Sequence, residues 1–142
     1  MESYKSLNHT KWECKYHVVW IPKYRKKVLY GQLRKELGPV FRQLASQKES
    51  EVIEGHMKVD HVHVLVSIPP KYSVAQVVGY VKGKSAIWVA RATGLGRNFV
   101  GQNFWARGYC VSTVGLDEDV IQEYIRGQEE ADKKMDQLKI FE

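Results

Sequence analysis

The stretch that decides the fold is Val59-Asp60-His61-Val62-His63-Val64-Leu65-Val66-Ser67-Ile68. Its side chains alternate with a period of two, which is typical of a strand with two unlike faces. One face is apolar and consists of Val62, Val64, Val66 and Ile68. The other face carries His61 and His63. Because residues i and i+2 of a strand lie about 7 Å apart, both imidazoles can lean toward one divalent metal ion. A histidine pair on a solvated strand face is the alternative interpretation.

Length and composition indicate a single globular domain. The chain has 142 residues, of which 44% are hydrophobic and 27% charged, enough for one real core. No apolar run approaches the ~20 residues that span a bilayer, and segment 1–15 lacks the apolar core of a signal peptide. Cys14 and Cys110 do not form a C-x-x-C pair, so we expect reduced thiols in a cytoplasmic protein without a membrane partner.

The charge balance hints at a polyanionic partner. Lysine and arginine outnumber aspartate and glutamate by 22 to 16, which gives a net charge of +6. Basic surfaces attract phosphate backbones at long range. The segment 23–27 (Lys-Tyr-Arg-Lys-Lys) surrounds one aromatic ring with cations, although a solvated basic loop explains it equally well.

The remaining pattern predicts a short series of further elements. In chain order these are a strand in 14–21, a helix within 33–47, a strand in 50–58, a helix in 73–92, a strand in 104–114 and a final helix in 116–139. Gly38-Pro39 predicts a kink or a restart in the first helix. Ser73 and Gln76 form a capping box at the start of the second. The strand 104–114 should place on one face Trp105, Arg107, Tyr109, Val111 and Thr113.

This order of elements predicts an α+β fold of the ferredoxin-like (RRM-like) plan. An antiparallel sheet would carry two helices on one face, and a C-terminal helix would be added to it. We expect one domain, 1–142, with a core of about 10–115 and the terminal helix at about 116–139. The apolar side of the histidine strand would meet the helices. The histidines would then lie on the open face, where ligands can reach them.

The final helix carries Tyr124 and Gln128, which are four residues apart and therefore share one helix face. The tyrosine hydroxyl would have a polar amide as its neighbour. Gly127 lies between them and weakens the helix by about 1 kcal/mol relative to alanine, which suggests close approach or flexibility. Packing of the tyrosine in the core is the alternative.

Together these residues match a known pattern. His61-Val62-His63 is a His-hydrophobe-His (HUH) motif, and Tyr124 to Gln128 follows on a C-terminal helix. The chain closely resembles the small single-tyrosine HUH transposases, TnpA type, of minimal bacterial insertion sequences. The resemblance covers nearly the whole chain and includes segments 12–17, 22–25, 59–63, 79–85 and 104–109.

The resemblance implies a role for each matching residue. Tyr124 would be the nucleophile, and His61, His63 and the side-chain oxygen of Gln128 would hold Mg²⁺ or Mn²⁺. The expected reaction is metal-assisted transesterification of single-stranded DNA at insertion-sequence ends, through a 5′-phosphotyrosine. The family acts as a homodimer on DNA with hairpin ends, and its tyrosine helix can serve the partner's histidines.

DNA contacts are predicted from charge and aromatic character. The predicted contacts are Lys23, Arg25, Lys26, Lys82, Lys84 and Arg107. Trp20, Tyr24 and Trp105 are possible stacking platforms, with sheet packing as the alternative. Segment 79–85 ends like a phosphate-binding P-loop, but it has three residues between its glycines instead of four and lies in a predicted helix. We therefore expect no nucleotide cofactor, and Lys82 and Lys84 contact phosphates or lie on a solvated helix face.

Three alternatives stay open at this point. The first is another HUH nuclease, either a replication initiator or relaxase, or a domesticated relative that processes host repeats. The second is a single-strand-binding module of the RNA-recognition type, which should carry paired aromatics where this chain has His61 and His63. The third is a phosphodiesterase that activates water, which would not need Tyr124.

Overall fold

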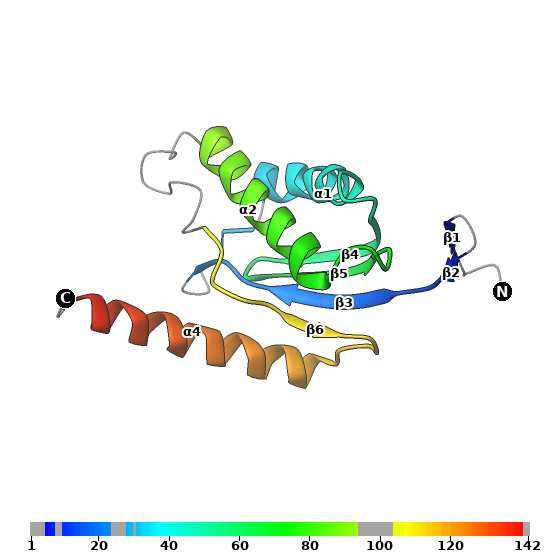
Figure 1. The fold of residues 1–142 in the computed structure, drawn as a ribbon. Helices are drawn as coiled ribbons and strands as arrows, with labels where there is room; N and C mark the ends of the chain where they lie inside the picture. The colour runs from blue at the N-terminus through cyan, green and yellow to red at the C-terminus, as the bar shows by residue number, and fades with distance from the viewer. Residues whose placement is uncertain (1–4, 8–9, 24–27, 30, 94–103, 141–142) are drawn as a thin grey trace.

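The structure is a computed structural model that describes residues 5–7, 10–23, 28–29, 31–93 and 104–140 (Figure 1). Its elements, in chain order, are β1 (Lys5–Leu7), β2 (Thr10–Trp12), β3 (Lys15–Trp20), α1 (Gly31–Ser46), β4 (Glu51–Lys58), β5 (His61–Ser67), α2 (Val74–Thr93), β6 (Cys110–Ser112) and α4 (Glu118–Ile140). The β1–β2 hairpin, which forms a separate two-stranded sheet, was not expected from the sequence.

The central sheet confirms the ferredoxin-like plan. Its four strands are antiparallel in the order β4-β5-β3-β6, so the histidine strand β5 is central and β4 is an edge. The predicted hairpin joins β4 to β5, with Lys58 opposite His61. A register shift between Val52 and Glu54 marks a bulge near the start of β4.

The main core lies between the sheet and the helices α1 and α2, which cover one face (Figure 1). The predicted apolar side of β5 is buried there; it comprises Val62, Val64, Val66 and Ile68. The capping box of α2 is confirmed, because Ser73 N donates to Gln76 Oε1 at 2.7 Å and Gln76 N donates to Ser73 Oγ at 3.0 Å. Helix α1 continues through Pro39 as one element, so the predicted restart is wrong. Burial of Leu37 and Phe41 on either side of Pro39 favours the continuous helix.

The opposite face of the sheet is partly covered, which corrects the expectation of an open face. Helix α4 lies along it (Figure 1), and a second apolar cluster fills the space between them. The cluster consists of Val19, Ile21, Ala106, Ile121 and Ile125, with Cys110, Leu116 and Tyr124 packed against it. The sequence placed α4 after the sheet but did not reveal this contact.

The predicted strand 104–114 is much shorter than expected. Only Cys110–Ser112 forms β6, and Trp105 is buried rather than sharing a face with Val111, which is 42% exposed. Two contacts with α2 explain the difference. Trp105 Nε1 donates to Ser85 Oγ at 3.0 Å, and Lys82 Nζ donates to the carbonyls of Ala106 and Gly108 at 2.8 and 2.6 Å. Carbonyls bonded by a lysine do not need a strand partner.

The sequence also led us to expect no membrane-spanning helix and no disulfide bond. None of the helices, as far as the described residues show, is long and apolar enough to cross a membrane. Cys14 and Cys110 are both free thiols.

Candidate active site

His61 is the most deeply buried of the four predicted active-site residues. Its side chain is buried, and its Nδ1 lies 2.9 Å from Oδ1 of the buried Asp60. A carboxylate only accepts hydrogen bonds, so Nδ1 carries the proton and Nε2 is the nitrogen left for a metal. Carboxylate–histidine pairs of this kind orient metal-binding imidazoles in many sites.

His63 lies in a row of imidazoles across the same face. Its Nε2 is 3.4 Å from Nδ1 of His17 on β3, and its ring centroid is 6.4 Å from that of His56 on β4. Burial lowers the pKa of His63, and the nearby His17, His56 and His61 lower it further, while Glu54 has the opposite effect. The neutral imidazole, which is the form that binds metals, is therefore favoured.

Tyr124 reaches the same sheet face from α4, but over a different part of it. Its ring packs on the second cluster, which contains Val19 of β3. In the sheet, Val19 lies between His63 on one side and Cys110 on the other. Neighbouring strands are about 4.8 Å apart, so this row of side chains joins the tyrosine region to the histidine pair.

The surroundings of the Tyr124 hydroxyl disfavour its ionised form. It is buried and has no hydrogen-bond partner among the described residues. Burial raises the pKa of Tyr124 well above its ordinary value, and Cys110 and Asp132 add smaller effects in the same direction. The phenol is therefore neutral in this conformation, and Gln128 is not the polar neighbour of its hydroxyl that the helix spacing suggested.

Gln128 is held by the loop before β6. Its Nε2 donates to the backbone carbonyl of Arg107, which leaves its side-chain oxygen as an acceptor. Gly127 has open space around the position of a Cβ, so the predicted close approach is wrong. The structure thus brings Tyr124 and Gln128 onto the histidine face of the sheet, but Tyr124 packs against the second apolar cluster and Gln128 bonds to the Arg107 carbonyl rather than to a histidine.

The donors present fit the expected metal in part. Within the described ranges no three histidine, cysteine, aspartate or glutamate side chains form a metal-binding group. The predicted set is of another kind, two imidazoles and a carboxamide, which suits a divalent ion with open positions. The Asp60–His61 pair has the orientation such a site needs. Nε2 of His63 lies 3.4 Å from Nδ1 of His17, so binding of an ion through that nitrogen would replace this contact.

The structure places the side chains that were predicted to contact DNA in different environments. Lys82 is half-buried and binds two loop carbonyls, so it does not lie on a freely solvated helix face, and its contact with a phosphate stays a prediction. Lys23 lies near Asp132, where it counteracts the burial that raises the pKa of that carboxyl. Lys84 and Arg107 are exposed and remain available. Arg25, Lys26 and Tyr24 lie outside the described residues.

Trp20 and Trp105 belong to the core, which confirms the alternative interpretation that they pack against the sheet rather than stack on bases. Trp20 and Trp105 are 2% and 5% exposed, with ring centroids 5.9 Å apart. Neither offers a free face for stacking a base.

Sequence reasoning missed three residues of this region. Asp60 directly precedes His61, and only a search for partners of the imidazole would have singled it out. Asp132 is buried and continues the i, i+4 stripe of Tyr124 and Gln128, so helical spacing could have revealed it. His17 carries no such signal, because its nearness to the site depends on the pairing of β3 with β5.

The fold and this site define a class of protein: a ferredoxin-like α+β domain with a histidine pair on the central strand and a tyrosine helix across the same face. The family model described as "Transposase IS200 like" matches residues 10–128. The chain belongs to this IS200-like transposase family.

Individual relatives agree with this family. The transposase of insertion sequence IS200 from Salmonella typhimurium is 44% identical over 137 residues, covering 96% of this chain and 90% of the relative. The ISDra2 transposase TnpA of Deinococcus radiodurans is 36% identical over 120 residues, covering 82% and 85%.

Two solved structures are similar in fold. A crystal structure of a Deinococcus radiodurans R1 protein described as a transposase has a TM-score of 0.73 at 29% identity, covering 87% of this chain and 96% of that one. A REP-associated tyrosine transposase bound to a REP hairpin has a TM-score of 0.52 at 11% identity, covering 84% and 67%. The second likeness concerns the fold alone.

Proposed function

We propose that this transposase cleaves and rejoins single-stranded DNA at insertion-sequence ends by transesterification through Tyr124. The observation that supports the proposal is that His61 and His63 of β5 and Tyr124 of α4 lie on the same face of the sheet, although Tyr124 does not contact the histidines. Family membership supports a DNA-cleaving enzyme. It does not by itself identify the nucleophile; the place of Tyr124 on the histidine face of the sheet supports the assignment of that residue.

The reaction exchanges one phosphoester for another. The Tyr124 oxygen attacks the scissile phosphorus, the bond to the 3′ oxygen breaks, and that oxygen leaves as a 3′-hydroxyl after taking up a proton. A 5′-phosphotyrosine results. Attack by a second 3′-hydroxyl reverses the step at a new junction and restores the phenol, so neither water nor a nucleotide cofactor is consumed.

Two conditions follow from the geometry. The buried, neutral Tyr124 has to leave the apolar cluster, which requires α4 to shift, since its hydroxyl meets no base where it lies. A divalent ion, Mg²⁺ or Mn²⁺, would be held by His61, His63 and the Gln128 oxygen and would stabilise charge on the phosphate oxygens. Asp60 keeps His61 oriented for that role.

The substrate and assembly are part of the same proposal. One tyrosine can hold one cleaved end, whereas excision produces two, so a homodimer is the natural unit. DNA with hairpin ends is the expected substrate; the hairpin bound by a protein of similar fold is consistent with it. The net charge of +6 favours such a polyanion.

The test is a covalent adduct. Labelled single-stranded DNA with an end hairpin is incubated with the protein and Mg²⁺ or Mn²⁺, and the products are separated on a denaturing gel. We expect a DNA–protein adduct with the wild type and none with Tyr124→Phe. Tyr72→Phe, on the helix side of the sheet, is the matched control and should form the adduct at the wild-type rate.

Other outcomes of this assay identify the alternatives. Cleavage that continues unchanged in Tyr124→Phe, without an adduct, means hydrolysis by activated water. Binding without any cleavage means a single-strand-binding module. Either result rejects the proposed chemistry.

A further inference from the structure

His17 lies beside the metal-binding histidines and has no part in the proposed reaction. Its Nδ1 is 3.4 Å from Nε2 of His63, and the two ring centroids are 5.6 Å apart. The two residues are diagonal neighbours on paired strands, because His63 of β5 is directly opposite Val19 of β3. Both side chains are half-buried, so an ion from solvent can reach them.

The distance between these two nitrogens matches that of two ligands of one ion. Zinc–imidazole bonds are about 2.0–2.1 Å long, and two nitrogens bound at a tetrahedral angle are therefore about 3.4 Å apart. A hydrogen bond donated by a ring N–H is ordinarily about 2.7–3.2 Å long. The separation of His17 and His63 is thus long for a direct hydrogen bond and suits an ion placed beside the line that joins the nitrogens.

This pair of imidazoles is complete without the terminal helix. The set expected for the reaction is His61, His63 and Gln128, and Gln128 is here bonded to the carbonyl of Arg107. His17 and His63 both belong to the sheet, whose strand pairing holds them together while α4 rests on the second cluster. Nε2 of His63 is common to both sets, so the two sets cannot be occupied at the same time.

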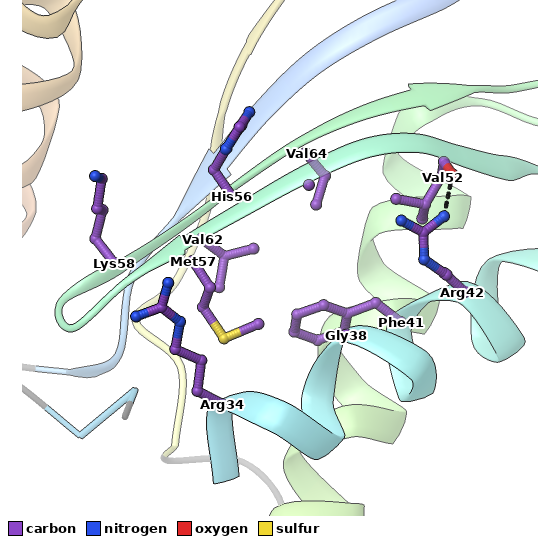
Figure 2. Close-up of a pocket in the computed structure, with 11 residues that line it drawn as sticks. Arg34, Gly38, Phe41, Arg42, Val52, His56, Met57, Lys58, Val62 and Val64 are labelled. Carbon is purple, nitrogen blue, oxygen red and sulfur yellow. Dashed lines mark hydrogen bonds between the residues drawn. The ribbon is translucent and has the colours of Figure 1, made fainter. Parts of the chain in front are cut away.

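His56 of β4 lies on the same face but outside the pair. It is directly opposite His63, and Figure 2 shows its ring pointing away from Phe41. Its ring centroid is 6.4 Å from that of His63, and its Nε2 lies 3.2 Å from Oε1 of Glu54. Because no three histidine, cysteine, aspartate or glutamate side chains form a metal-binding group in the described part of the chain, water has to complete the coordination.

Imidazole ligands select Zn²⁺ over Mg²⁺, which prefers oxygen. We propose that His17 and His63 form a second metal site that binds Zn²⁺, with water in the remaining positions. Zinc held there occupies the nitrogen of His63 that the reaction's own ion needs, so the site adds an inhibitory ion to the proposed function. Its test does not depend on that function, because zinc binding is measured without DNA.

Nitrogen chemical shifts identify the ligands in the wild-type protein. Zn²⁺ alone is titrated into the isotopically labelled full chain, and long-range proton–nitrogen correlation spectra of the imidazoles are recorded. We expect large shifts of Nδ1 of His17 and Nε2 of His63, with little change at His56 and His61. A large shift of Nε2 of His61 in place of His17 would overturn the inference, because zinc would then occupy the site assigned to the reaction.

Substitutions test the same assignment through affinity. Isothermal titration calorimetry should show Zn²⁺ binding at least about tenfold weaker in His17→Phe, since loss of even an outer partner of a ligand costs about 10–100-fold. His56→Phe removes the neighbouring imidazole and is the matched control. Gln128→Ala removes a ligand of the reaction's ion. Both should stay within about twofold of wild type, as surface substitutions ordinarily do.

Thermal unfolding verifies that each variant is folded, and if His17→Phe is not, the wild-type spectra decide. No binding of Zn²⁺ by the wild type, or equal weakening by His17→Phe and His56→Phe, contradicts the assignment. Weakening by Gln128→Ala but not by His17→Phe does so too, because it places zinc beside α4. The adduct assay contains Mg²⁺ and no zinc, so failure of the zinc site and failure of the tyrosine chemistry are distinguishable.

Discussion

Asp60 and Tyr124 show how neighbours decide what a single residue can do. The carboxylate of Asp60 holds Nδ1 of His61 and so presents the opposite nitrogen. Tyr124 has no such partner, and burial among apolar side chains raises the pKa of its hydroxyl. For the proposed function, this means that His61 already has the orientation of a metal ligand, whereas Tyr124 would have to move before it could attack.

At the residue scale, Asp60→Asn should weaken metal binding. The neutral amide holds His61 less firmly and makes its imidazole a poorer ligand, so Mn²⁺ affinity should fall about tenfold or more. Electron paramagnetic resonance of free Mn²⁺ during a titration measures this directly, without DNA. Glu51→Gln removes an exposed carboxylate at the far end of β4, where it pairs with Lys5, and should have little effect. Unchanged affinity in Asp60→Asn would show that the contact has no positioning role.

At the scale of elements, α2 and α4 both bind the short segment 106–108 that precedes β6. Lys82 of α2 binds the carbonyls of Ala106 and Gly108, and the carbonyl of Arg107 between them accepts from Gln128 of α4. The lysine thus shapes the surface on which α4 lies. Burial lowers the pKa of Lys82 to about 8 from 10.5, which links this connection to pH.

The pH dependence has a definite sign. Between about pH 8 and 10.5 the unfolded chain still binds the Lys82 proton that the folded protein has lost, so stability rises with pH. Urea unfolding at pH 7.5 and 9.5 should show a rise of about 1–2 kcal/mol from this group in the wild type. Lys82→Met should lack that increment, whereas Lys84→Met, an exposed lysine of the same helix, should keep it. Equal pH profiles for both variants would contradict the assignment.

At the scale of the whole molecule, the sheet separates two cores of unequal size. The larger cluster under α1 and α2 contains most of the buried side chains, and the smaller one under α4 is centred on Ile125, which is fully buried. An element held by the smaller core opens at lower cost. This suits the movement of α4 that the proposed reaction needs.

Hydrogen exchange should reveal this separation. Ile125→Ala removes about 2–4 kcal/mol of packing, so amides of α4 should exchange at least about thirtyfold faster while those of α2 stay close to wild type. Val77→Ala, in the main core under α2, is the control and should speed exchange in α2 and the sheet as well. Uniform acceleration in Ile125→Ala would mean that the two cores unfold together.

The sequence by itself determined the order of the main strands and helices, although not the β1–β2 hairpin or the short extent of β6. The period-two pattern of β5 identified its buried valines, and the capping box located the start of α2. The order of strands and helices then allowed few topologies other than the ferredoxin-like one. These predictions are correct because hydrophobic spacing and helix capping involve residues that are close together in the sequence, so the pattern can be read from one segment.

Only the tertiary structure decided how the segments meet. Trp105 joins the main core, Lys82 binds two loop carbonyls, and Tyr124 packs on the second cluster. Each outcome depends on a partner far away along the chain. Burial of an indole or pairing of a carbonyl contributes more than local strand propensity. The register of β3 against β5, which brings His17 to His63, is likewise a property of the assembled sheet.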